Sequence, residues 1–142
     1  MADIAMQIDV AAPPSAVYDA LTTTAGVAGW WTTKNETTGT VGDVNRYWFP
    51  GAPMTYDLRV EEARAGELVR WRCLAGPPEW VDTEIVWTLS SPSEGTTLVL
   101  LDHNGFAEVG PMYRIVTLGW AQMVLHLKQS LETREPAPFF TV

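Results

Sequence analysis

The strongest constraint on the fold is a long segment near the C-terminus, from Met112 to about Thr133, that contains no proline and only one glycine, Gly119. Its apolar residues recur at steps of three and four, which places them on one face of an α-helix. They are Tyr113, Val116, Trp120, Met123, Val124, Leu127 and Leu131. A helix of this length is a rod of about 33 Å, long enough to cross a whole sheet.

The preceding part of the chain supplies that sheet. Residues 4–10 alternate between apolar and polar side chains, which predicts a half-buried strand. Pro13 and Pro14 then open a short helix, a second short helix ends at Gly29, and residues 32–43 read as a loop. Further alternating runs, at 54–60, 69–73, 85–89 and 96–103, are separated by turns. Close strands with short connections form an antiparallel meander, so we expect one α+β domain over residues 1–142.

Charge and composition exclude several classes of function. The net charge is −8 and the nine Lys and Arg residues are scattered, so we expect no binding of nucleic acid. No apolar run approaches the ~18 residues of a membrane span, so we expect no membrane insertion. The single cysteine, Cys73, forbids an internal disulfide and favours the cytoplasm. One Cys, two distant His and no phosphate-binding glycine motif predict neither a metal nor a cofactor.

Four short sequence motifs follow one another along the chain. They are Ala12-Pro13-Pro14 with Val17 and Leu21, the pair Trp30-Trp31, the run from Gly95 to Phe106 around His103, and Gly119-Trp120 with Leu127 and Leu131. Together they resemble the START/Bet v 1-like (SRPBCC) superfamily, in the branch named after activators of a heat-shock chaperone ATPase. The resemblance implies a helix-grip fold, in which a curved antiparallel sheet wraps around the long C-terminal helix and leaves a cavity between them.

An aromatic wall suits such a cavity, because apolar ligand sites are built from aromatic side chains with a few polar groups. We predict that a small apolar or amphipathic ligand is bound there. The predicted lining is Trp31, Trp48, Tyr56, Leu58, Trp71, Trp87, Leu101, His103, Tyr113, Val116, Trp120 and Met123. The alternative for Tyr56, Trp71, Trp87 and Trp120 is ordinary packing in the core.

His103 is the one candidate for acid–base catalysis. Its parity with Thr97, Val99 and Leu101 points it inward, where it either contacts a ligand or is a hydrogen-bonded structural histidine. Asp102 points to the other face of the strand and cannot orient it. His126 falls opposite Trp120 on the long helix, so we expect it to be solvated.

Three further features are open. Trp80, in a proline-containing loop, either folds back on the core or acts as a lid or partner contact. Phe139 and Phe140, in the tail, have the same alternatives, and a second subunit in a homodimer would provide the cover that so apolar a tail needs. Arg46 and Arg59 are expected on the exposed face of the sheet, and they would matter if the ligand were an anion.

Three functions fit these features. The first is a non-enzymatic module that holds a ligand in the apolar cavity. The second is an enzyme of the cyclase or hydratase type that uses His103 as its acid or base. The third is a protein–protein role with a chaperone ATPase, as the branch name suggests.

Overall fold

The computed structural model describes residues 1–142. Its elements are β1 (Ala2–Val10), α1 (Pro14–Thr22), α2 (Thr24–Ala28), β2 (Asn35–Glu36), β3 (Val44–Tyr47), β4 (Tyr56–Arg64), β5 (Leu68–Ala75), β6 (Glu84–Ser90), β7 (Thr97–Phe106) and α3 (Pro111–Thr133). The expected α+β order, with two short helices after the first strand and a long helix at the end, is confirmed.

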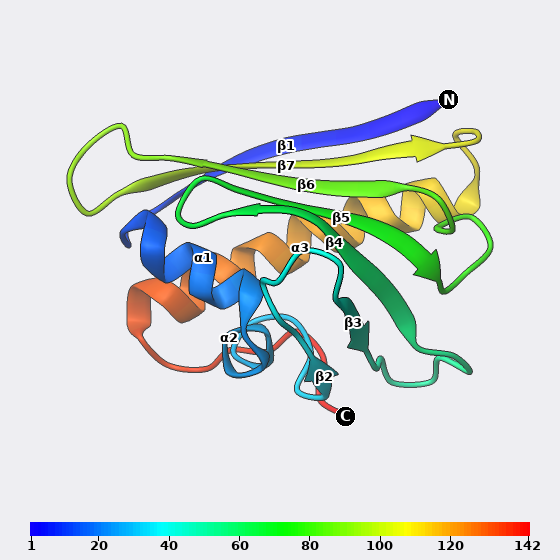
Figure 1. Cartoon of the computed structure of the whole chain (residues 1–142), viewed down its shortest axis with the longest axis horizontal. Coiled ribbons are helices and arrows are strands. Elements are labelled where there is room, and N and C mark those ends of the chain that lie inside the picture. The colour runs from blue at the N-terminus through cyan, green and yellow to red at the C-terminus, as the bar shows by residue number, and fades with distance from the viewer.

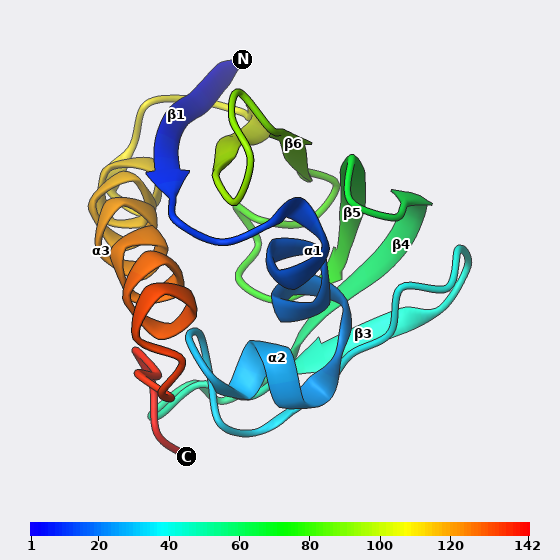
Figure 2. The ribbon, with the colours of Figure 1, turned by 90° about the vertical axis from the view of Figure 1, so that its left-hand side faces the viewer.

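All seven strands form one antiparallel sheet in the order β1-β7-β6-β5-β4-β3-β2. The meander runs from β2 to β7, and β1 adds to its far edge. Seen end-on in Figure 2, the sheet curves from β1 towards β3, and α3 lies across the open side of the curve. Helices α1 and α2 close one end (Figure 1). This is the helix-grip arrangement, and it is confirmed.

Strand alternation decides which side chains reach the interior. In β7, Thr97, Val99, Leu101 and His103 are buried while their neighbours are more exposed. The predicted face of α3 is likewise buried from Val116 to Leu127. Its two ends, Tyr113 and Leu131, are half-buried. None of the three helices has the length and apolarity that a bilayer crossing requires.

Tryptophan fills most of the space between α3 and the sheet. Six of the seven indoles are buried. Trp31 lies at the centre of this group, with its ring centroid 5.5 Å from that of Trp30, 6.2 Å from Trp71 and 5.4 Å from Trp120. Trp87 meets Trp120 edge to face at 5.7 Å. Most of the aromatic residues predicted to line a cavity therefore contact one another and form the core.

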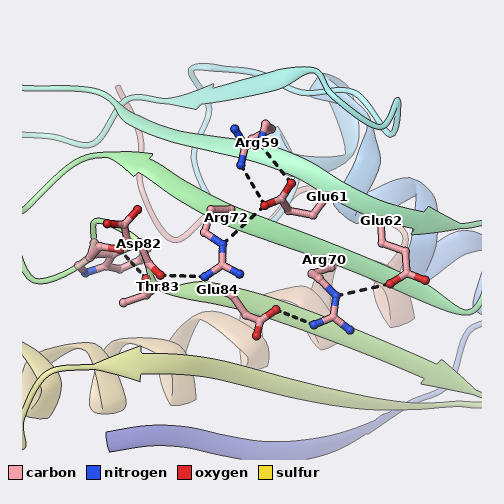
Figure 3. Close-up of polar contacts among 9 residues, drawn as sticks. Arg59, Glu61, Glu62, Arg70, Arg72, Asp82, Thr83 and Glu84 are labelled. Atoms are coloured by element: carbon pink, nitrogen blue, oxygen red, sulfur yellow. Dashed lines mark hydrogen bonds and ion pairs between the residues drawn. The ribbon is translucent and has the colours of Figure 1, made fainter. Parts of the chain in front are cut away.

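The outer face of the sheet carries the arginines. Figure 3 shows Arg59 and Arg72 both paired with Glu61, and Arg70 held between Glu62 and Glu84. The neighbouring guanidinium of Arg59 lowers the pKa of the Glu61 carboxyl. These pairs are partly exposed, so each contributes little to stability. Arg46 is exposed as well. Because these arginines lie on the outer face, they cannot contact a ligand between the sheet and α3.

Three boundaries differ from the sequence prediction. Met54 lies outside β4, because Pro53 precedes it in an exposed loop and proline cannot donate to a strand ladder. β7 continues past His103 to Phe106, where it still pairs with Ala2 of β1. Residues 32–43 include the two-residue strand β2, which pairs with β3.

Gly119, in the middle of α3, offers a direct test of helix energetics. A Cβ added there would meet only the Met123 Cε, at 3.8 Å, which is ordinary van der Waals contact. We therefore expect Gly119→Ala to raise the free energy of unfolding by about 0.5–1 kcal/mol, because alanine loses less backbone entropy on folding. Urea denaturation measures the change. Destabilisation would show that the surroundings of Gly119 are tighter than the structure indicates.

Candidate functional site

An apolar groove opens beside α3, between that helix and the loop that joins β3 to β4. Its volume is about 370 Å³. The lining residues are Trp31, Phe49, Pro50, Gly51, Ala52, Tyr56, Trp80, Met112, Ile115, Val116, Gly119, Met123, Phe139 and Phe140. None of them carries a charge, and eleven of the fourteen are hydrophobic. We call this feature the α3 groove.

Segments that are distant in sequence make its walls. One face of α3 contributes five lining residues, with Gly119 at the middle and no side chain there to fill the space. The loop at residues 49–52 supplies the facing wall, where Phe49 packs edge to face on Tyr56 at 4.7 Å. Trp31 and Trp80, both buried, supply aromatic surface from the side of the core.

The C-terminal tail is the remaining wall, and it is fixed by backbone hydrogen bonds. The N–H groups of Phe139 and Phe140 donate to the carbonyls of Trp30 and Trp31 at 3.0 and 2.8 Å, and Thr33 N–H donates back to Phe140. Phe140 packs against Phe49 at 5.0 Å. The tail therefore finds its cover within the chain, and a second subunit is not needed for that purpose.

His126 secures the same tail, which corrects the expectation that it is solvated. Its Nδ1–H donates to the Ala137 carbonyl at 2.6 Å, and its ring meets Phe139 edge to face at 5.1 Å. The helical pattern correctly placed His126 on the side away from the core, but that side is where the tail returns.

Trp80 folds back onto the core, which settles the alternatives for its loop. Its side chain is 4% exposed and packs edge to face on Tyr56 at 5.0 Å and on His103 at 4.7 Å. The backbone N–H of Trp80 donates to Pro77, and its carbonyl accepts from the Thr83 hydroxyl at 2.6 Å. The loop is a fixed part of the groove and not a lid.

His103 is fully buried, and both its ring nitrogens are hydrogen-bonded. Trp120 Nε1–H donates to Nδ1 at 3.0 Å, so Nδ1 carries no proton and Nε2 does. Nε2 lies 2.8 Å from Thr83 Oγ1, whose own hydrogen goes to Trp80. We call this series, from Trp120 through His103 and Thr83 to Trp80, the His103 chain. Burial lowers the pKa of His103 to about 3, so the imidazole stays neutral.

The groove therefore has few chemical functions beyond apolar contact. Tyr56 is its one titratable lining residue, and burial raises the pKa of that phenol. Burial also raises the pKa of Cys73 to about 12, and Cys73 does not reach the groove. No group of three or more His, Cys, Asp or Glu is placed to hold a metal ion. The indole N–H groups of Trp31 and Trp80 have no hydrogen-bond partner in the chain.

Four of the twelve predicted ligand residues line the α3 groove: Trp31, Tyr56, Val116 and Met123. Six others lie in the packed core, namely Leu58, Trp71, Trp87, Leu101, His103 and Trp120. The last two, Trp48 and Tyr113, lie elsewhere. Trp48 lies under the Lys34 ammonium at 4.9 Å, and the Tyr113 hydroxyl donates to the Asp3 carbonyl at 2.8 Å.

The prediction missed the loop at 49–52 and the outer edge of α3, Met112 and Ile115. An apolar Phe-Pro-Gly-Ala-Pro run at 49–53 was the available signal, since exposed loops are seldom so apolar. Phe139 and Phe140 also line the groove, although their apolar character alone does not predict a place at the ligand.

Comparison with known families gives a match over residues 11–132 to the model of Activator of Hsp90 ATPase homolog 1-like protein. Among solved structures, the Aha1 dimer from Colwellia psychrerythraea is similar, with TM-score 0.83, 32% identity, and coverage of 93% of this chain and 97% of that one. No curated protein matches.

Two more distant structures share the fold. DynU16, from the dynemicin biosynthetic locus, has TM-score 0.80 and 24% identity over 99% of this chain, which spans 51% of that protein. CalU16 from Micromonospora echinospora has TM-score 0.72 and 18% identity, with 95% and 76% of the two chains covered.

The neutral state of His103 has a consequence for stability. Because its pKa is lower in the folded state than the 6.5 of an unperturbed histidine, the unfolded chain binds more protons between these values. The free energy of unfolding should therefore fall as the pH drops below about 6.5, by about 2–3 kcal/mol at pH 4.5 from this residue alone. Urea denaturation at several pH values measures the fall.

His103→Gln is the control, because it removes this residue's share of the pH dependence and keeps that of the carboxylates. An equally steep loss in the variant would contradict the assignment. If the variant does not fold, nitrogen NMR of the wild-type ring at pH 5 decides the same point, and a protonated Nδ1 would contradict the assignment.

Proposed function

The chain belongs to the family of Activator of Hsp90 ATPase homolog 1-like proteins, and on that premise we propose that it binds a small apolar or amphipathic molecule in the α3 groove. The observation that carries this proposal is a groove lined by fourteen residues without a single charge. Its volume of about 370 Å³ falls within the ~300–1,000 Å³ that ligand pockets usually have.

The walls of the groove are held in place whether or not a ligand is bound. Its walls are tied to the core by the backbone hydrogen bonds of the tail and by stacked aromatic rings. Rigid walls lose little conformational entropy when a ligand enters. Little of the free energy gained from apolar contact is therefore spent on ordering the site. Among the lining residues Tyr56 carries the one hydroxyl, which suits a ligand that has a polar group as well as apolar surface.

Binding is favoured over catalysis because the groove has no His, Cys, Asp, Glu or Lys in its lining, and its one titratable residue is Tyr56, whose pKa is raised by burial. His103 was the candidate, yet it does not line the groove and both its nitrogens are engaged. A general acid or base must lie within hydrogen-bond reach of the group that it serves. The geometry gives His103 a structural role and supports an apolar binding site.

We further propose that the protein forms a homodimer. The support is the relative from Colwellia psychrerythraea, whose structure is described as a dimer and which is 32% identical over 93% of this chain. The tail does not supply the interface, because its phenylalanines are packed within the chain.

Filling the α3 groove should abolish binding. We expect wild-type protein to bind the neutral fluorescent probe N-phenyl-1-naphthylamine, and Gly119→Phe to weaken that binding at least tenfold because the new ring occupies the groove. Fluorescence titration measures the affinity, and Gly119→Ala is the matched control that should bind within about twofold of wild type.

Circular dichroism and a cooperative melt establish that Gly119→Phe is folded. Ala52→Trp, which fills the groove from the opposite wall, provides a second obstruction that leaves the helix unchanged. Failure of the wild type to bind the probe, or equal affinity in both obstructed variants, would rule out the α3 groove as the binding site.

A further inference from the structure

A stripe of apolar residues on α3 faces away from the sheet and nothing in the chain covers it. Ile115 is 67% exposed, Leu118 63% and Leu125 58%. Apart from the N-terminal Met1, Ile115 and Leu118 are the most exposed large apolar residues of the protein. Single exposed leucines are common, but three in line on one helix indicate a contact surface.

The spacing of the stripe is that of a helix-pairing seam. With Gln122 and Gln129, the positions 115, 118, 122, 125 and 129 follow steps of three, four, three and four, and all five side chains are exposed. This is the alternation by which two helices pack along their length, with a polar residue at one position fixing the register. We call these five residues the outer seam.

Two charged residues flank the outer seam. Arg114 and Glu132 are 18 residues apart, five turns of about 3.6 residues, so they lie on the same flank at opposite ends of α3. Arg114 is exposed and takes part in no ion pair of this chain. The Glu132 carboxylate uses Oε2 both for the Ala11 N–H and for Lys128, and Oε1 accepts no hydrogen bond.

We propose that the outer seam is the surface on which a second copy of this chain docks, with the two α3 helices antiparallel about a two-fold axis near Gln122. This proposal rests on the proposed homodimer and specifies its interface. In this arrangement Leu118 meets the partner's Leu125, and Ile115 lies beside the partner's Gln129. Arg114 then lies next to the partner's Glu132, because a two-fold axis keeps the same flank of both helices on the same side.

Charge selects the antiparallel orientation. A parallel pair would leave Arg114 and Glu132 at opposite ends of the interface, where neither could reach the other. The antiparallel pair forms two Arg–Glu contacts, and each uses a guanidinium and a carboxylate oxygen that are unengaged within the chain. Symmetry also places both α3 grooves on one side of the dimer, because Met112 and Gly119 lie on one flank of the outer seam and Ile115 lies where the seam and the groove meet.

The interface is small, since the seam spans about 21 Å and offers three apolar side chains per copy. We therefore expect a dimer with a dissociation constant of about 1–100 μM, in the weak range of protein–protein contacts. Sedimentation velocity across a concentration series that brackets this range should show wild-type protein changing from monomer to dimer.

Variants test the surface. Leu118→Glu and Leu125→Glu should each weaken dimerisation at least tenfold, while Val41→Glu, which replaces an equally exposed apolar residue away from α3, should not. Melting curves should show all three folded, because the replaced side chains are exposed. All three should also keep the affinity of wild type for N-phenyl-1-naphthylamine.

The orientation is tested by charge reversal. Arg114→Glu alone should weaken the dimer, and combining it with Glu132→Arg should restore it. A wild type that is monomeric throughout the series would overturn the homodimer itself. A dimer that survives both leucine variants would place the interface elsewhere, and failure of the double reversal to restore association would overturn the antiparallel arrangement.

Discussion

The hydrogen bond from Trp120 to His103 is the contact on which the interior depends. It joins the middle of α3 to β7, and Thr83 extends it to the start of β6 and to the loop that carries Trp80. Both ring nitrogens of His103 and the Thr83 hydroxyl have partners in the His103 chain, so the chain ties the helix to the sheet at one relative position. Apolar contacts have no preferred direction and hydrogen bonds do, so these bonds define the register of the helix on the sheet more closely than the surrounding rings.

The two faces of the sheet are organised in opposite ways. The inner face is aromatic and almost without charge, whereas the outer face carries arginines paired with glutamates. The groove follows from this division, because the tryptophans fill the centre of the curve and leave space only at its edge. The space at that edge stays open. It is bordered by a glycine in α3, a proline-containing loop and the returning tail.

Periodicity was sufficient to predict the long helix, the antiparallel sheet and the inward direction of His103, since all three depend on local spacing. It was not sufficient to separate Trp31, which reaches the groove, from Trp71 and Trp87, which do not, because depth in the core depends on what packs above each ring. Trp48 and His126 show the same limit. One is held by Lys34 and the other by a tail eleven residues away, and neither contact has a signature in local spacing.

The tryptophan cluster also gives the protein a collective optical property. Six buried indoles, linked by ring separations of 5.4–6.4 Å, lie well within the range over which electronic excitation passes from one ring to the next. Light absorbed by any one of them is shared by all, so the emission reports on the cluster as a unit. A molecule that touches only Trp31 and Trp80 would thus alter the emission of indoles that it never contacts.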